Sequence, residues 1–278
     1  MEAPPPEVFG GFDGQRAYAH VAQLVAIGPR PPGSEGMRRA QEYIRGQLRS
    51  FGCRVVEEDD FRASTPVGSV PMKNFLVKVP GAGAHVVLLA THYDTKRLEN
   101  FVGANDGGSS TGLMLELARR LCARKNALTV WIAFFDGEEA FVKWSETDGT
   151  YGSRQMAAKL ALSGELPRIK AMLLADLIGD RNLRVKREWH STRWLTDLVW
   201  ATAARLGYQS VFLSEEFSTE DDHLPFLRRN VPAVDIIDLN IQYWHTAGDT
   251  LDKISPRSLA IVGHVIFESL AELEKKLR

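Results

Sequence analysis

Cysteine is scarce in this sequence, with only Cys53 and Cys122 among 278 residues. This scarcity excludes a small fold stapled by several disulfides. A chain of this length buries about three quarters of its unfolded surface, so its core needs no covalent staple. Both cysteines lie beside apolar runs, which favours two buried free thiols, although the sequence alone leaves a bridge between them open.

Long apolar runs and a dominant charge are also missing. No stretch of about 18 apolar residues occurs, so no membrane-spanning helix is expected. The formal net charge is −1 and the basic residues are scattered, so no strong field attracts nucleic acid. We expect a monomer with neither a nucleic-acid partner nor a membrane partner.

The N-terminus lacks the basic region and the apolar core of a signal peptide. Residues 1–6 are instead rich in proline and fit the mature start of an exported protein with an added methionine. We therefore expect export, to the periplasm or outside the cell, and an extended Pro-rich arm over residues 1–12.

Apolar runs and helical repeats alternate along the rest of the chain. Continuous apolar runs, typical of strands buried on both faces, occur at residues 86–90, 128–135, 169–175 and 231–237. Apolar residues at helical spacing lie between them and in a last stripe over residues 259–277. Because no linker or internal repeat divides the chain, we predict a single catalytic α/β domain over residues 13–278. Its central sheet is mixed but mostly parallel, and helices flank it.

Residues of the kinds that bind metals follow these strand runs. Because ligands gather at the carboxyl ends of strands in such sheets, we expect five candidates to meet at one edge: His92, Asp106, Glu139, Asp176 and His245. Imidazole and carboxylate ligands without cysteine favour zinc, with manganese or cobalt as alternatives.

Glu138 and Glu139 stand side by side after an apolar run. From an extended strand they would point to opposite sides, but at a strand end one can face a metal while the other faces a substrate. Phe134, Phe135 and Phe141 lie close by in the sequence and indicate partial burial. A buried glutamate beside a metal can act first as a base and then as an acid near neutral pH.

The order of these motifs resembles a known family. It is similar to that of the zinc aminopeptidases of the M28 type and, more closely, to that of the animal-type glutaminyl cyclases (glutaminyl-peptide cyclotransferases). The resemblance covers roughly residues 14–275. The segments that carry it are residues 30–34, 65–68, 92–96, 101–106, 134–141 with Trp144, 145, 151–154, 176–179, 221–229 and 244–246.

The resemblance implies an aminopeptidase-like fold, one zinc ion and a set of residue roles. Such an enzyme converts an N-terminal glutaminyl residue of a peptide or protein to pyroglutamyl and releases ammonia. By position, the implied roles are zinc ligands for Asp106, Glu139 and His245, proton shuttle for Glu138, an acidic hydrogen-bonded chain for Asp176 and Asp221, and pocket walls for Trp144 and Trp244.

The sequence departs from the animal-type pattern at several places. Thr91 and Thr111 stand where vertebrate members have a disulfide beside the zinc site, and Asp235 stands where they have a histidine. Pocket details beyond the two tryptophans therefore do not carry over from the resemblance.

A di-zinc aminopeptidase is the alternative function. His92 and Asp176 would then bind one metal, Glu139 and His245 the other, and Asp106 would bridge them. Glu138 would be the base for an attacking water. A non-catalytic binding module is a third class, and the intact ligand set disfavours it.

Overall fold

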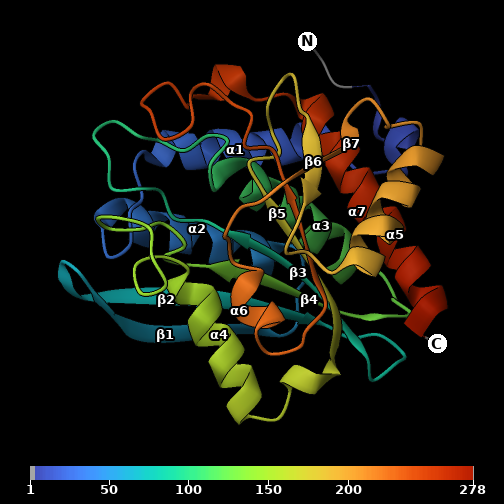
Figure 1. The fold of residues 1–278 in the computed structure, drawn as a ribbon, viewed down its shortest axis with the longest axis horizontal. Helices are drawn as coiled ribbons and strands as arrows, with labels where there is room; N and C mark the ends of the chain where they lie inside the picture. The colour runs from blue at the N-terminus through green and yellow to red at the C-terminus, as the bar shows by residue number, and fades with distance from the viewer. Residues whose placement is uncertain (1–3, 278) are drawn as a thin grey trace.

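A computed structural model describes residues 4–277 of the chain. Its centre is a six-stranded mixed sheet with strands Val56–Thr65 (β1), Gly68–Val79 (β2), Val86–His92 (β3), Thr129–Phe135 (β4), Ile169–Asp176 (β5) and Ala233–Ile237 (β8) (Figure 1). The strand order is β1-β2-β4-β3-β5-β8. The last four strands in this order run parallel to one another, whereas β1 and β2 form an antiparallel hairpin that joins β4 in antiparallel fashion.

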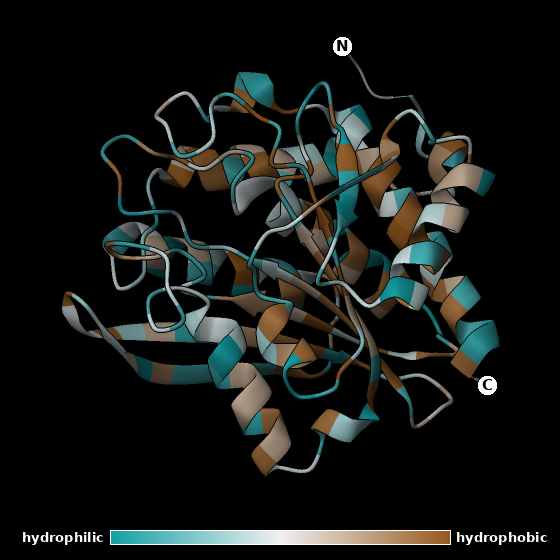
Figure 2. Ribbon diagram, viewed as in Figure 1, coloured by the Kyte–Doolittle hydropathy of each residue, from teal (hydrophilic) through white to brown (hydrophobic). Residues whose placement is uncertain are grey.

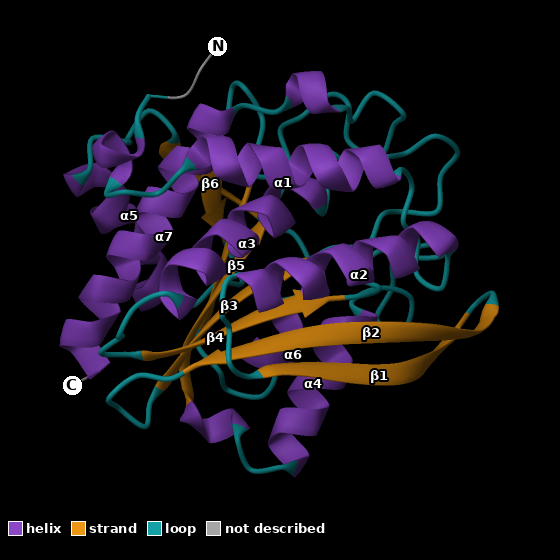
Figure 3. Cartoon of the chain, turned by 180° about the vertical axis from the view of Figure 1, so that it is seen from behind, coloured by secondary structure: helices purple, strands orange, loops and turns teal. Residues whose placement is uncertain are grey.

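Helices cover both faces of this sheet, as Figure 3 shows from behind. One face carries Gly14–Ile27 (α1), Glu35–Ser50 (α2), Gly108–Cys122 (α3), Arg193–Arg205 (α5) and Pro256–Leu277 (α7). The other face carries Tyr151–Leu162 (α4) and the short Leu224–Leu227 (α6). The predicted α/β fold with a mixed central sheet is confirmed. Within residues 4–277, no helix has the length and apolar character needed to cross a membrane.

The parallel strands form the middle of two apolar cores. Every residue of β3 and β4 is buried. In β4, Ile132 and Phe134 pack into the core beneath α1 and α3, whereas Trp131 and Phe135 pack into the core beneath α4. This burial on both faces explains the continuous apolar runs in the sequence, which appear as brown strands inside the molecule in Figure 2.

A second, two-stranded parallel sheet is formed by Val185–Glu188 (β6) and Phe212–Phe217 (β7), and the sequence patterns did not predict it. β6 is only four residues long and carries two basic residues, and β7 exposes three consecutive polar residues. Neither strand therefore has the apolar run of an interior strand. Short 3-10 helices occur at Leu166–Arg168 (η2) and Leu251–Lys253 (η3).

The N-terminal arm differs from the extended segment that we expected over residues 1–12. Pro6–Phe9 form a 3-10 helix (η1), so the expectation is wrong there, and residues 1–3 lie outside the described part of the chain. Phe9 and Phe12 are buried. Phe12 packs so closely on α7 that a Cβ on Gly263 would come within 2.5 Å of its ring. Burial of these two rings holds the arm on the domain.

Cys53 and Cys122 form a disulfide, so the expectation of two free thiols is wrong. Cys53 follows the end of α2, and Cys122 is the last residue of α3. Because these helices pack on the same face of the sheet, their ends meet, with the two Cα atoms 5.1 Å apart. The pairing depends on how the two helices pack, which the local sequence does not reveal.

We expect the double substitution Cys53→Ser, Cys122→Ser to lower the free energy of unfolding by about 4 kcal/mol, because the bridge closes a long loop in the unfolded chain. Urea unfolding at 25 °C, followed by circular dichroism, measures this difference. In the presence of a reductant, the free energy of unfolding of the wild-type protein should fall by a similar amount. A double variant as stable as the oxidised wild type would contradict the expectation.

Candidate metal centre and active site

The carboxyl ends of β3, β4, β5 and β8 lie at one edge of the sheet because these strands are parallel. A cavity of about 620 Å³ opens there. The predicted site residues that line it are Asp106, Glu138, Glu139, Trp144, Asp176, Asp221, Trp244 and His245. His92 is buried behind this lining, in contact with two of these carboxylates. All predicted site residues therefore come together, while their individual roles stay predictions.

Asp106, Glu139 and His245 converge on one point. His245 Nε2 lies 3.3 Å from Asp106 Oδ2 and 3.2 Å from Glu139 Oε1. Both carboxylates are buried, and within the described residues neither of these two oxygens accepts a hydrogen bond. The other Glu139 oxygen pairs with Lys96 Nζ at 3.1 Å. Two unsatisfied carboxylate oxygens beside an imidazole nitrogen form a donor set that fits a divalent cation.

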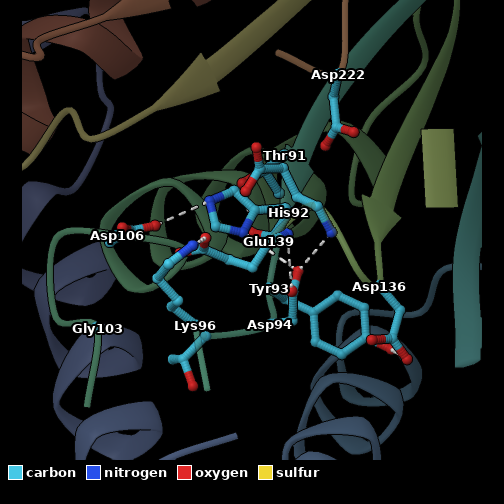
Figure 4. Close-up of polar contacts among 12 residues, drawn as sticks. Thr91, His92, Tyr93, Asp94, Lys96, Gly103, Asp106, Asp136, Glu139 and Asp222 are labelled. Carbon is cyan, nitrogen blue, oxygen red and sulfur yellow. Dashed lines mark hydrogen bonds and ion pairs between the residues drawn. The ribbon is translucent and has the colours of Figure 1, made fainter. Parts of the chain in front are cut away.

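His92, Asp106 and Asp176 form a second candidate group of ligands. His92 Nε2 lies 3.3 Å from Asp106 Oδ1 and 3.0 Å from Asp176 Oδ1. Figure 4 shows the His92 ring and the Asp106 carboxylate facing each other. Asp106 belongs to both groups, with a different oxygen directed at each histidine. The arrangement can hold one metal ion, or two that share Asp106.

Asp94 positions the two adjacent glutamates. Its carboxylate accepts hydrogen bonds from the backbone N–H of Glu138 at 3.0 Å and of Glu139 at 3.2 Å. The same carboxylate lies 3.3 Å from His92 Nδ1, as the dashed lines around Asp94 in Figure 4 indicate. Gly137 has a φ of 74°, a conformation that side chains rarely adopt, and it lets the chain turn sharply after β4. The turn and Asp94 together direct both glutamates into the cavity.

Asp249 holds the Asp106 loop in the same way. Its carboxylate oxygens accept hydrogen bonds from the backbone N–H of Asn105 at 2.8 Å and of Asp106 at 3.0 Å. The buried guanidinium of Arg30 supports this loop from behind and donates to the carbonyl of Gly103 at 2.8 Å. Buried polar groups are thus paired on both sides of the loop.

Sequence reasoning missed the positioning roles of Asp94, Asp249 and Arg30. Each belongs to a segment that carried the resemblance or follows one closely, since Asp94 is two residues after His92 and Asp249 is four after His245. That proximity was the only local signal, because all three act on backbone groups far away in the sequence.

Burial, reinforced by neighbouring carboxylates, dominates the electrostatics on the Glu138 side. Burial raises the pKa of Glu138 well above its usual value, and the charges of Glu139 and Asp221 add to this effect against the opposing charge of His92. Burial also raises the pKa of Asp221 well above its usual value, helped by Asp176. These groups therefore favour a proton or a cation close by.

The imidazoles of His245 and His92 lower the pKa of Asp106, in contrast to the raised pKa values of Glu138 and Asp221. Although burial alone would raise it, the adjacent imidazoles of His245 and His92 hold the pKa of Asp106 below its usual value. Burial opposes the charged form of His245, but its contacts with Asp106 and Glu139 raise its pKa to about 9. Positive charge is therefore favoured at the point where the first group of ligand atoms converges.

Two tryptophans stand at the wall of the cavity. The Trp244 ring stacks on His245 with centroids 4.0 Å apart and is 44% exposed. Trp144 is half-buried, and its indole Nε1 donates a hydrogen bond to Glu220 Oε2 at 2.9 Å. The cavity thus combines an acidic floor with aromatic walls, which suits a small polar group carried on a chain.

Fold and site together define an α/β enzyme whose candidate metal ligands follow parallel strands. A model of peptidase family M28 matches residues 74–270. The glutaminyl-peptide cyclotransferase of Boiga irregularis is 33% identical and aligns with 85% of this chain and 75% of its own length. The glutaminyl-peptide cyclotransferase-like protein of Bos taurus is 32% identical, with 98% of this chain and 79% of its own covered.

Solved structures agree with these relatives. The crystal structure of an Acidobacteriales bacterium glutaminyl cyclase has a TM-score of 0.92 and 40% identity, covering 99% of this chain and 97% of its own. A leucine aminopeptidase precursor from Bacteroides thetaiotaomicron has a TM-score of 0.85 and 26% identity, covering 96% and 98%. The chain belongs to peptidase family M28 and, within it, to the glutaminyl-peptide cyclotransferases.

We expect Asp94→Asn to weaken the binding of Zn²⁺ by about 10- to 100-fold, as is usual when a group that orients metal ligands is changed. An asparagine has one carbonyl oxygen for two backbone N–H groups, and its NH₂ would face the second of them. Competition with a chromophoric chelator measures the affinity. Glu99→Gln, which changes an exposed carboxylate nearby in the sequence, should bind as the wild type does. Equal affinity in both variants would refute the role of Asp94.

Proposed function

We propose that this chain converts the N-terminal glutaminyl residue of peptides or proteins to pyroglutamyl and releases ammonia, with one zinc ion held by Asp106, Glu139 and His245. The observation that carries the proposal is the position of Glu138 in the cavity, directly beside the ligand Glu139 and between aromatic walls. Membership of the glutaminyl-peptide cyclotransferases supports it.

The donor set suits zinc, which takes imidazole nitrogen and carboxylate oxygen and leaves a position open for substrate in catalytic sites. Zinc bound there would supply a Lewis acid that polarises the γ-amide carbonyl of the glutaminyl side chain. His245 and Glu139 line the cavity, so a zinc ion held by them would act on a peptide N-terminus bound in that space.

Glu138 is the proposed proton carrier. Its carboxylate takes a proton from the α-amine as that nitrogen attacks the γ-carbon, and it passes the proton to the leaving nitrogen, which departs as ammonia. One of the buried carboxyls of Asp176 and Asp221 keeps a proton, which lowers the negative charge around Glu138. Because ring closure needs no water, the walls of Trp144 and Trp244 help by excluding it.

The proposed substrates are therefore peptides or proteins with an exposed N-terminal glutamine. The chain acts as a monomer in an oxidising compartment, the periplasm or the cell exterior. The bridge between Cys53 and Cys122 supports this location, because disulfides persist in oxidising surroundings.

A di-zinc aminopeptidase is the second candidate function, and one observation favours it. His92 and Asp176 form a second ligand group with Asp106, so the inventory for a second metal is complete. Glu138 would then activate a water for peptide hydrolysis. The two functions differ in metal content, with one zinc per chain in the cyclotransferase and two in the aminopeptidase.

Incubation of the zinc-loaded enzyme with a glutaminyl peptide should yield a product lighter by one ammonia, as measured by mass spectrometry. A peptide that begins with alanine is the control and should stay unchanged. Loss of a whole N-terminal residue would instead identify an aminopeptidase, and an unchanged glutaminyl peptide would refute both functions.

We expect Glu138→Gln to lower kcat by about 10²- to 10⁴-fold, which is the usual contribution of a general acid–base group. The amide keeps the size of the side chain but cannot carry the proton. KM and the zinc content should change little, because Glu138 is not a ligand in this arrangement. Steady-state kinetics and elemental analysis measure these quantities, with Glu99→Gln as the control. A kcat close to that of the wild type would show that another group carries the proton.

A further inference from the structure

Glu220 and Trp144 form a bridge across the rim of the cavity. The indole Nε1 of Trp144 donates to Glu220 Oε2 at 2.9 Å, and both residues line the cavity. Trp144 belongs to the loop that follows β4, whereas Glu220 lies between β7 and α6, directly before Asp221. The hydrogen bond therefore connects two segments of the cavity lining that are 76 residues apart in the sequence.

The backbone of the Trp144 loop is fixed independently of this bridge. Asp148 accepts hydrogen bonds from the backbone N–H groups of Phe141, Val142 and Lys143 at 2.8, 2.9 and 3.0 Å. The next residue, Gly149, leaves room for the Trp144 ring, since a Cβ there would approach it to 3.0 Å. The loop thus brings the indole to the rim of the cavity, where its N–H reaches Glu220.

The N–H of the Trp144 indole has the Glu220 carboxylate as its acceptor. An indole has a single N–H donor and no acceptor, so one hydrogen bond satisfies its polar capacity. A carboxylate acceptor makes this bond stronger than a neutral group would. Glu220 directly precedes Asp221 in the sequence. The same short segment therefore carries the acceptor of the Trp144 hydrogen bond, which we call the tether, and a member of the proposed acidic chain.

We propose that Glu220 is a positioning residue that determines how tightly peptide substrates bind, by holding Trp144 as a fixed wall of the cavity. This inference rests on the proposed function. If the Trp144 ring is already fixed before the substrate arrives, no conformational entropy is lost in ordering it on binding. The hydrogen bond to Glu220 therefore strengthens the binding of the substrate. It leaves the proton transfers at Glu138 unchanged.

The kinetic test compares Glu220→Ala, Glu220→Gln and wild type on one glutaminyl peptide. Glu220→Ala should raise KM about two- to fivefold, as expected for the loss of one exposed charge-assisted hydrogen bond, with kcat within about 1.5-fold of wild type. Glu220→Gln keeps an acceptor oxygen, so its KM should stay close to that of the wild type. The control is Glu146→Ala, which removes a mostly exposed carboxylate from the same loop and should behave as wild type.

The position of the ring is measured without activity by NMR of the indole N–H signals, of which the chain has six. The signal that disappears in Trp144→Phe belongs to Trp144. Loss of the carboxylate acceptor should move this signal upfield in Glu220→Ala, whereas Glu220→Gln and Glu146→Ala should leave it close to its wild-type position.

The outcomes separate the inference from the proposed function. A wild-type enzyme that fails to cyclise the peptide refutes the function, whatever the NMR spectrum shows. If wild type cyclises the peptide but Glu220→Ala keeps both KM and the Trp144 signal, the tether does not exist. If KM rises as much in Glu220→Gln as in Glu220→Ala while the Trp144 signal of Glu220→Gln stays at its wild-type position, Glu220 acts through its charge on the substrate amine, and the inference is wrong.

Discussion

Asp94 connects the two sides of the site, because its carboxylate accepts the backbone N–H groups of Glu138 and Glu139 and also contacts His92. An extended strand would direct adjacent glutamates to opposite sides. The turn at Gly137 and the hydrogen bonds to Asp94 end the extended conformation, so both side chains line one cavity. A single buried carboxylate therefore orients a candidate ligand on β3 and determines where the proposed proton carrier on the β4 side lies.

The candidate ligands were found in the sequence because burial makes the ends of interior strands recognisable as apolar runs. A strand covered on both faces is a continuous apolar run in the sequence. A buried carboxylate at its end, such as Asp176 at the end of β5, therefore indicates a cation or a hydrogen-bond donor beside it. Groups that act across the fold leave no such signal. Asp249 accepts hydrogen bonds from the Asp106 loop across more than 140 residues of chain, a partnership that only the fold reveals. The expectation of two free thiols was wrong for the same reason, since the bridge between Cys53 and Cys122 depends on where α2 and α3 end in space.

The rigid and adjustable parts of the cavity have different origins. Its floor is fixed by buried carboxylates that bind backbone N–H groups, and such bonds are costly to break because the groups they satisfy have no access to water. Its walls depend on side chains nearer to solvent, namely Trp244 stacked on His245 and Trp144 tethered to Glu220. We therefore expect changes to the floor to affect metal binding and chemistry, and changes to the walls to affect the binding of the peptide.

His92 is the residue at which the one-metal and two-metal arrangements differ. Its Nε2 contacts Asp176 and Asp106, and its Nδ1 contacts Asp94. A doubly protonated ring donates from both nitrogens and brings one positive charge to these carboxylates, whereas a metal at Nε2 would bring that charge instead and requires a neutral ring. His92 is almost fully buried, while the side chain of His245 is 24% exposed at the cavity. A cation beside His245 can therefore reach a substrate carbonyl, and a charge at His92 mainly holds the neighbouring carboxylates. The proposed cyclisation uses a single Lewis acid and no activated water, so an imidazolium at His92 would be sufficient for it, whereas hydrolysis by two metals would require the second ion in that place.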